Sequence, residues 1–236
     1  MNSLIILAAG LGERAKQKDP KQFFLLDKNK KIRILYLQYP YLENVSHNFD
    51  EIIIVVPKKW KDLISQEINQ ICSISKVISG GRNRSESSYL GLKACSSDCI
   101  NVLIHDAARP FASKKIYNSC IKYLEKYDSV IPIVNTKDTS IYIESSQNKK
   151  EAFFLNRDCL KSIQTPQAFK YNIIRNAYDK KTTDKTDDLQ ILLDYQANSK
   201  VRFINGEESN FKITNEQDIK MIQALYNSNK HNILYE

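Results

Sequence analysis

The chain has 236 residues, of which 42% are hydrophobic and 26% are charged, and both values lie near the average of globular proteins. This composition excludes a globally disordered chain, and no run approaches the roughly 18 apolar residues of a membrane-spanning helix. The net charge of +8 at pH 7 admits either nucleic-acid binding or an anionic substrate such as a nucleotide or sugar phosphate, and composition alone does not choose between them.

Short aliphatic runs bounded by turn residues predict β-strands in the first part of the chain. Each run is continuous rather than alternating in hydrophobicity, which is typical of strands that are buried on both faces of a parallel sheet. Between these runs, apolar residues recur at helical spacing. The predicted strands are 4–8, 51–56, 101–104 and 129–134, and the predicted helices are 60–71, 85–94 and 115–127.

The alternation of strands and helices predicts an α/β fold with a Rossmann-like, mostly parallel sheet and helices on both of its faces. Ligands of such sheets bind at the carboxyl ends of the strands. Neither a Gly/Ser/Pro-rich linker nor an internal repeat divides the sequence, so we expect residues 1–236 to form a single domain. Pro40 falls within a helical stretch, 34–44, and should kink or shorten it.

A β-hairpin is predicted after the strand at 129–134. Two apolar runs, 141–144 and 152–155, flank the polar turn 145–150. An isolated hairpin is only marginally stable in water. We therefore expect an inserted arm, at about 137–158, that packs on the second subunit of a homodimer.

The cysteines and histidines do not form a recognisable metal or disulfide pattern. Five cysteines give an odd count without paired Cys-x-x-Cys spacing, and the three histidines lie far apart. Cys95 and Cys99 could supply half of a zinc site, but no second half follows them. We therefore expect unpaired thiols and a cytoplasmic protein.

A glycine-containing turn follows the first predicted strand and precedes a short motif with a lysine. Small residues in such a turn let backbone N–H groups approach phosphate oxygens, while Arg14 and Lys21 supply positive charge for a triphosphate. The pattern is not the dinucleotide-binding one, because Ala15 stands near the place of its third glycine, and it is not a Walker A motif. The two motifs are Ala8-Ala9-Gly10-Leu11-Gly12-Glu13-Arg14 and Pro20-Lys21-Gln22-Phe23.

Together these two motifs resemble the nucleotide-binding signature of the cytidylyltransferases that activate polyol phosphates, chiefly the 2-C-methyl-D-erythritol 4-phosphate cytidylyltransferase family. The resemblance covers nearly the whole chain, because further motifs of the family follow in the expected order. These are Gly80-Gly81-Arg82-Asn83-Arg84-Ser85-Glu86-Ser87, His105-Asp106-Ala107-Ala108-Arg109-Pro110-Phe111, Asp138-Thr139, Arg157, Gln164-Thr165-Pro166-Gln167, Thr183-Asp184 or Thr186-Asp187, and Asn210-Phe211-Lys212-Ile213-Thr214.

The resemblance implies a role for residues at the nucleotide. Arg14 and Lys21 correspond to the catalytic cations, which neutralise charge on the α-phosphate and on the departing pyrophosphate. Arg82 stands where the family has an aspartate, which is a departure near the base. The expected nucleotide-binding residues are Ala8, Ala9, Gly10, Gly12, Gly81, Arg84, Ser87 and Asp106.

Asp106 is the candidate metal ligand. It follows a predicted buried strand at its carboxyl end, where a carboxylate can bind Mg²⁺ on a triphosphate or a hydroxyl of the substrate. Mg²⁺ is therefore the expected cofactor. His105 precedes this carboxylate, but a phosphate nucleophile is already ionised near pH 7 and needs no general base, so we interpret His105 as structural.

The resemblance also implies where the polyol phosphate binds. Thr139 and Arg157 would reach it from the arm of the neighbouring subunit, and Thr165 and Lys212 from the same subunit, with Asp106 beside them. Arginine is suited to bidentate recognition of phosphate, whereas lysine supplies a point charge. The lysine that the family often has two residues after Asp-Thr is replaced here by Ile141.

The implied enzyme converts CTP and 2-C-methyl-D-erythritol 4-phosphate to 4-diphosphocytidyl-2-C-methyl-D-erythritol and pyrophosphate, in non-mevalonate isoprenoid precursor synthesis. The alternative is a cytidylyltransferase for ribitol 5-phosphate or another polyol phosphate, whose members share nearly all these motifs. A non-catalytic RNA-binding protein is a rival of another class. The scattered lysines and the presence of Arg14, Lys21 and Asp106 argue against it, so we expect neither a nucleic acid nor a membrane as partner.

Overall fold

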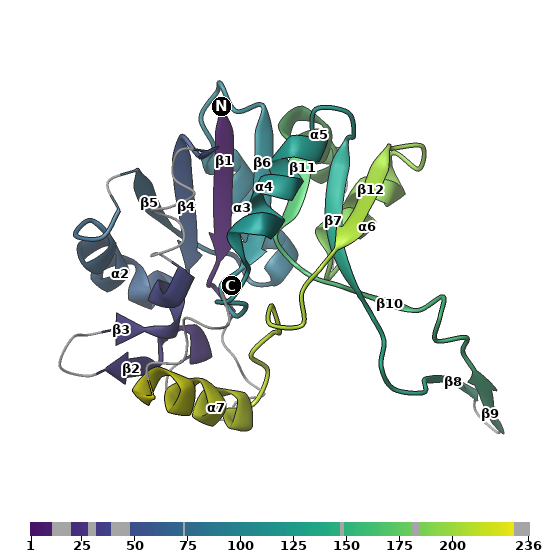
Figure 1. Cartoon of the computed structure of the whole chain (residues 1–236). Helices are drawn as coiled ribbons and strands as arrows, with labels where there is room; N and C mark the ends of the chain where they lie inside the picture. The colour runs from purple at the N-terminus through teal and green to yellow at the C-terminus, as the bar shows by residue number, and fades with distance from the viewer. Residues whose placement is uncertain are drawn as a thin grey trace.

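Eight strands form the central sheet: β1 (Asn2–Leu7), β4 (Glu51–Val56), β5 (Ser75–Ser79), β6 (Asn101–Asp106), β7 (Ser129–Asn135), β10 (Lys161–Ile163), β11 (Gln167–Lys170) and β12 (Val201–Asn205) (Figure 1). They lie in the order β10-β7-β11-β6-β1-β4-β5, with β12 beside β7. The computed structural model describes residues 1–10, 20–27, 32–38, 48–72, 74–146, 149–180 and 185–228.

The sheet is mixed, with mostly parallel pairs. β1 runs parallel to β4 and β6, β4 to β5, and β7 to β12, whereas β10 and β11 run antiparallel to their neighbours. The strands predicted from aliphatic runs correspond to β1, β4, β6 and β7. The predicted α/β fold with a mostly parallel sheet is thus confirmed.

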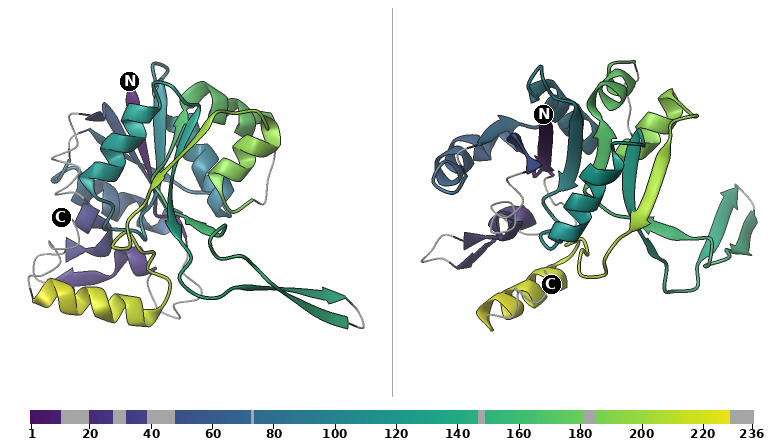
Figure 2. Two further views of the ribbon diagram at one scale, coloured as in Figure 1. Left: turned by 45° about the vertical axis from the view of Figure 1, so that its right-hand side comes forward. Right: turned by 45° about the horizontal axis from the view of Figure 1, so that its top comes forward.

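Side chains of the strands alternate between two apolar cores, one on each face of the sheet. In β1, Leu4 and Ile6 belong to one core, and Ile5 and Leu7 belong to the other. Helices cover both faces, as predicted (Figure 2). Each of these helices contributes buried residues to the core on its own side of the sheet. The first core is covered by α2 (Lys61–Ile68) and α4 (Lys114–Tyr123), and the second by α3 (Arg84–Ala94), α5 (Tyr171–Lys180) and α6 (Asp188–Tyr195).

A smaller layer lies beyond the carboxyl ends of the parallel strands. It contains a two-stranded sheet, two short 3-10 helices and the last helix of the described chain (Figure 1). Leu26 and Ile34 pack there with Ile219 in a third apolar cluster. These elements are the 3-10 helices Lys21–Phe23 and Ile34–Gln38, β2 (Leu25–Asp27), β3 (Ile32–Arg33) and α7 (Glu216–Asn227). Pro40 and most of its predicted helical stretch lie outside the described residues.

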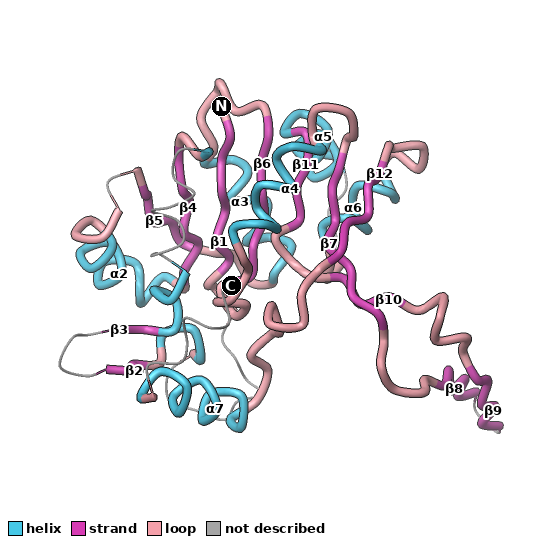
Figure 3. Tube along the Cα trace, in the orientation of Figure 1, coloured by secondary structure: helices cyan, strands magenta, loops and turns pink. Residues whose placement is uncertain are grey.

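A hairpin stands apart from the body of the molecule, where the sequence predicts an arm. β8 (Ile141–Ser146) pairs antiparallel with β9 (Lys149–Phe154) and with no strand of the central sheet. The connecting segments 136–140 and 155–160 join it to β7 and β10 (Figure 3). Its apolar side chains lie largely in solvent, and Phe154 is 81% exposed.

None of the helices in the described ranges has the length and apolar character needed to cross a bilayer.

Candidate active site

Asp106 ends β6 and lies at the centre of a group of charged side chains. One carboxylate oxygen, Oδ1, accepts a hydrogen bond from Arg84 Nε at 3.2 Å, and the other, Oδ2, accepts one from Lys212 Nζ at 2.6 Å. Arg84 is the first residue of α3, and Lys212 lies in the loop that leads from β12 to α7. The edge formed by the carboxyl ends of the strands therefore gathers three of the predicted site residues.

The charge of Asp106 is fixed by these neighbours. Burial alone would raise the pKa of Asp106, but the positive charges of Arg84 and Lys212 lower it well below its usual range. Asp106 is therefore ionised at physiological pH and can only accept hydrogen bonds or bind a cation.

Arg84 also contacts a second carboxylate, which the sequence analysis missed. Its Nη2 atom lies 2.7 Å from Oδ2 of Asp188, a fully buried residue at the start of α6. Tyr178 of α5 donates its hydroxyl to Oδ1 of the same aspartate at 2.5 Å. Burial lowers the pKa of Arg84, but the charges of Asp188 and Asp106 raise it well above its usual value.

Thr165 connects Asp106 to a buried histidine. The backbone N–H of Asp106 donates to Oγ1 of Thr165 at 3.0 Å, and Oγ1 lies 3.0 Å from Nδ1 of His105. The other ring nitrogen of His105, Nε2, lies 2.9 Å from the carbonyl oxygen of Arg109. A carbonyl only accepts, so Nε2 carries the proton and Thr165 donates its hydroxyl to Nδ1.

His105 is neutral in this arrangement. Complete burial lowers the pKa of His105 to about 4. Both of its ring nitrogens are occupied by contacts within the protein. It is a fixed support for Thr165 and for the end of β6, which is consistent with a structural role.

The Pro-Lys-Gln-Phe motif is attached to the turn after β1. Gln22 is buried and its amide donates to the carbonyl oxygens of Ala8, at 2.6 Å, and Gly10, at 2.8 Å. Lys21 beside it donates from Nζ to the carbonyl oxygen of Ile213, the residue after Lys212. The structure thus places Lys21 against the loop that also carries Lys212. Gly12 and Arg14 lie outside the described residues.

The Gly80-Gly81 turn packs against the residues that follow β1. A Cβ atom at Gly80 would lie 2.3 Å from Cβ of Ala9 and 3.0 Å from Oγ of Ser87, so only glycine allows this close approach. The N–H of Gly81 donates to Oγ of Ser87 at 3.1 Å. Four of the residues expected to bind the nucleotide, Ala8, Ala9, Gly81 and Ser87, therefore form adjoining parts of one wall.

Arg82 follows Gly81 and forms an ion pair at the surface. Its guanidinium group pairs with Glu86 at 3.0 Å, and its side chain is almost fully exposed. Arg82, which stands where the family has an aspartate, therefore takes part in a surface ion pair.

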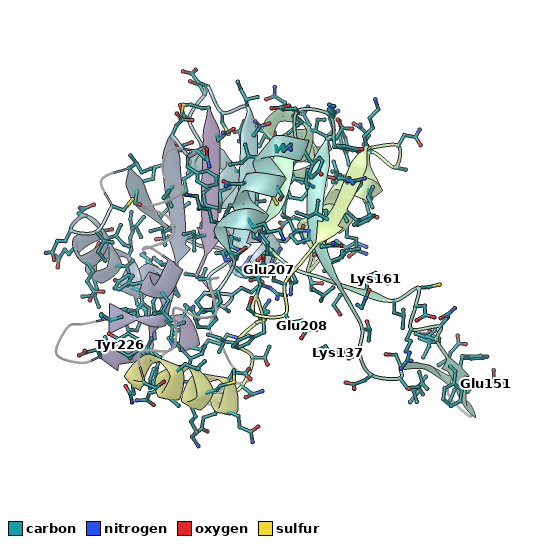
Figure 4. The ribbon with its side chains drawn as sticks, in the orientation of Figure 1. Lys137, Glu151, Lys161, Glu207, Glu208 and Tyr226 are labelled. Carbon is teal, nitrogen blue, oxygen red and sulfur yellow. The ribbon has the colours of Figure 1, made fainter. Side chains whose placement is uncertain are left out.

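Two predicted substrate-binding residues lie at a distance from this group. Thr139 lies between β7 and β8, and Arg157 lies between β9 and β10; both are exposed. Near the arm's root, Lys137 pairs with Glu208 at 2.6 Å (Figure 4). Among the described residues of a single chain, the structure does not bring Thr139 or Arg157 to Asp106.

Further residues hold the loops of the site in place. The guanidinium of Arg109 donates to the carbonyl oxygen of Asn210 at 2.8 Å, and the amide of Asn210 donates to that of Thr165 at 2.9 Å. Asp187 caps α6 and accepts from Gln167 at 2.7 Å. A pair of aspartates directly before an apolar helical run, Asp187 and Asp188, is the signal that could have pointed to α6.

The single carboxylate of Asp106 fits a magnesium ion that would be held mainly by the phosphates of a substrate. The described part of the chain contains no group of three or more His, Cys, Asp or Glu side chains that could hold a metal. Mg²⁺ usually keeps several waters and binds one or two carboxylates together with phosphate oxygens, and Asp106 offers one such carboxylate.

Comparison with known proteins gives one consistent result. The family model described as IspD, 2-C-methyl-D-erythritol 4-phosphate cytidylyltransferase, matches residues 3–228. The chain is 40% identical over 225 residues to the 2-C-methyl-D-erythritol 4-phosphate cytidylyltransferase of Clostridium botulinum (strain Loch Maree / Type A3), covering 92% of this chain and 94% of that protein. It is 35% identical over 235 residues to the enzyme of the same name from Clostridioides difficile (strain 630), covering 98% and 95%.

A solved structure agrees with these sequence matches. The crystal structure of 4-diphosphocytidyl-2C-methyl-D-erythritol synthase from Anaerococcus prevotii DSM 20548 superposes with a TM-score of 0.81 at 32% identity, and the match covers 96% of each chain. The fold is thus similar over nearly the whole length.

Proposed function

The chain belongs to the 2-C-methyl-D-erythritol 4-phosphate cytidylyltransferase family, and we propose that the reaction of this family takes place around Asp106. The enzyme transfers CMP from CTP to 2-C-methyl-D-erythritol 4-phosphate and releases pyrophosphate, in isoprenoid synthesis. The observation that supports this location of the active site is that Arg84 and Lys212 both pair with Asp106. Asp106 lies at the edge of the sheet where α/β proteins bind their ligands.

The substrate phosphate attacks the α-phosphorus of CTP in line, and pyrophosphate leaves from the opposite side. The nucleophile is already ionised, so the protein mainly positions two anions and neutralises their charge. We assign this neutralisation to Lys21 and Arg14. The contact of Lys21 with the Lys212 loop supports its half of the assignment, because it places the ammonium group beside the residues around Asp106.

The cytidine is proposed to lie against the wall formed by Ala8 and Ala9, which follow β1, and by the Gly80-Gly81 turn. This wall has few side-chain atoms, so a planar base and a ribose can approach the backbone closely. The backbone N–H groups of the loop after β1, which includes Gly10 and Gly12, are the candidates for contact with the triphosphate. Arg84 would contact the nucleotide while its guanidinium group stays between the carboxylates of Asp106 and Asp188.

Asp106 is proposed to hold Mg²⁺ together with the triphosphate. Bound there, the cation would neutralise charge on the phosphates and orient them for in-line attack. In the structure described here, Oδ2 of Asp106 accepts from Lys212. An approaching substrate phosphate offers Lys212 a second anionic partner. If the ammonium group of Lys212 moved to that phosphate, Oδ2 of Asp106 would be left for the metal.

The polyol phosphate is proposed to bind between two chains of a homodimer. Lys212 and Thr165 would contact it from one chain, and Thr139 and Arg157 from the arm of the other. The exposed apolar side chains of the hairpin, Phe154 above all, support an arm that is covered by a second copy. The distance of Thr139 and Arg157 from Asp106 within one chain supports the same arrangement.

We also propose that the enzyme works in the cytoplasm. The odd number of five cysteines without paired spacing is typical of proteins from a reducing compartment. All five are free in the structure.

The test is a comparison of substrates. CTP-dependent release of pyrophosphate is measured with 2-C-methyl-D-erythritol 4-phosphate and with ribitol 5-phosphate at equal concentrations. We expect a much higher kcat/KM with the methylerythritol phosphate. A preference for ribitol 5-phosphate would assign the chain to a different polyol and would contradict the function given above.

A further inference from the structure

Arg84 is held from two sides, and its two partners differ in character. Asp106 lies at the site and is also bound by Lys212, whereas Asp188 is fully buried behind it. Tyr178 satisfies the second oxygen of Asp188 from inside the protein. The side chains of Asp106, Arg84 and Asp188 therefore form a continuous chain of charges that runs from the site into the core.

The two cations on Asp106 are not equally free to leave it. Lys212 lies on a loop, has a flexible stem and keeps 38% of its side chain exposed. Arg84 keeps 23% exposed, and its departure would leave the buried charge of Asp188 without its cation, which is strongly unfavourable. An incoming phosphate can therefore draw away Lys212 while Arg84 stays in place.

We propose that Asp188 is a positioning residue for the reaction, which acts by pinning Arg84 so that Arg84 holds Oδ1 of Asp106 while Oδ2 is released to the substrate complex. This inference rests on the proposed role of Asp106. It assigns a function to a residue that lies too deep to touch either substrate.

The central variant is Asp188→Asn, which keeps the shape of the side chain and can still accept from Tyr178 but loses the charge that holds Arg84. Residues that orient the direct ligands of a site typically contribute 10- to 100-fold, so we expect a loss of about that size in kcat/KM. Calorimetric titration with CTP and Mg²⁺, without the polyol phosphate, should show a similar loss of affinity. This second measurement does not depend on turnover.

A double-mutant cycle tests whether Asp188 acts through Arg84. Arg84→Gln removes the guanidinium group, so the further change Asp188→Asn should reduce kcat/KM little in that background. Losses that simply multiply would contradict the proposal, because they would mean that Asp188 contributes independently of Arg84.

Glu51→Gln is the matched control. Glu51 is also a buried carboxylate that pairs with a cation, Lys76 at 2.8 Å, and accepts from a hydroxyl, that of Ser3 at 2.7 Å. It starts β4, at the end of the sheet opposite to the site. We expect this variant to lower the unfolding temperature and to leave kcat/KM and CTP affinity unchanged.

Two outcomes separate this inference from the proposed function. If Asp106→Asn retains wild-type activity, the proposed role of Asp106 fails. If Asp106→Asn is inactive but Asp188→Asn behaves like Glu51→Gln, only the positioning role of Asp188 is overturned.

If Asp188→Asn does not fold, Arg84→Lys replaces it as the test. The lysine keeps the charge, but its compact ammonium group lacks the planar fork that spans both carboxylates. A 10- to 100-fold loss of CTP affinity in the folded variant is expected, and wild-type affinity would overturn the proposal.

Discussion

The ammonium group of Lys21 donates a hydrogen bond to the backbone carbonyl of Ile213, which lies 192 residues later in the chain. Ile213 in turn donates its N–H to the carbonyl of Ala108 at 2.8 Å, two residues after Asp106. One short segment therefore contacts both the lysine motif and the loop after β6. Residues from three distant parts of the sequence are joined into one site by this segment.

Replacing Lys21 should reduce catalysis more than binding. In Lys21→Ala we expect kcat to fall by about 10²–10³, because a preorganised positive charge acts most strongly on charge that develops in the transition state. The KM for the polyol phosphate should change much less. Steady-state kinetics of pyrophosphate release give both values.

Lys58→Ala is a suitable control for Lys21→Ala. Lys58 also follows a proline and starts a short 3-10 helix, but its side chain is exposed. It should retain wild-type kinetics. A Lys21→Ala enzyme with wild-type turnover would remove Lys21 from the catalytic assignment.

The enzyme should prefer CTP over the other nucleoside triphosphates. A pocket that forms hydrogen bonds to the edge of cytosine leaves its polar groups unpaired with another base, which costs affinity. Rates of pyrophosphate release with CTP, UTP, ATP and GTP at equal concentrations measure this preference. Equal rates with CTP and UTP would show that the wall beside Ala9 and Gly81 does not select cytosine.

The stability of the protein should fall between neutral and mildly acidic pH because of His105. Burial lowers the pKa of His105 to about 4, against an ordinary value of 6.5. Above pH 6.5 both folded and unfolded chains hold a neutral imidazole, so the residue has no effect. As the pH falls below 6.5 the unfolded chain takes up a proton that the folded chain does not, and the free energy of unfolding decreases by about 2 kcal/mol between pH 7 and pH 5.

Denaturant unfolding at several pH values measures this effect, and His105→Asn is the comparison. The variant has no imidazole to titrate, so its free energy of unfolding should fall less over the same range. Parallel curves for the two proteins would contradict a neutral, buried His105.

Mixed dimers should recover activity that neither parent has. Arg157→Ala and Lys212→Ala should each be nearly inactive, but a dimer with one chain of each kind has one site with both residues intact. Random reassortment makes about half of the dimers mixed, so roughly a quarter of wild-type activity should return. Co-expression with two different tags and sequential purification isolates these dimers.

The outcome of the mixed-dimer experiment is decisive for the shared site. Purified mixed dimers that are no more active than either parent would place Arg157 and Lys212 in the pocket of the same chain, or would exclude one of them from it.

The sequence predicts those strands that carry their own signal. β1, β4, β6 and β7 are long aliphatic runs, buried on both faces, and all four were predicted. β10 has three residues and β11 has four, with polar or charged residues among them. Such segments become strands only because β7 and β6 offer them backbone partners, and that depends on the tertiary structure.

The site shows the same division between local and tertiary information. The motifs identify Lys21, Asp106 and Lys212 as candidates, and the structure brings all three to one end of the sheet. The contact between Arg84 and Asp188 could not be predicted, because it depends on the start of α3 meeting the start of α6. No pattern within either segment indicates that approach.

The path of the chain through the site has a consequence for folding. Asp106 and Lys212 are separated by 106 residues, and β12 and α7 on either side of the Lys212 loop belong to the last part of the described chain. Contacts between such distant segments form late, because closing a long loop costs conformational entropy before the contact stabilises it. When only β1, β4 and β6 of a nascent chain have emerged from the ribosome, the emerged part contains Asp106 but not Lys212. The chain therefore cannot be active until its C-terminal segment has docked.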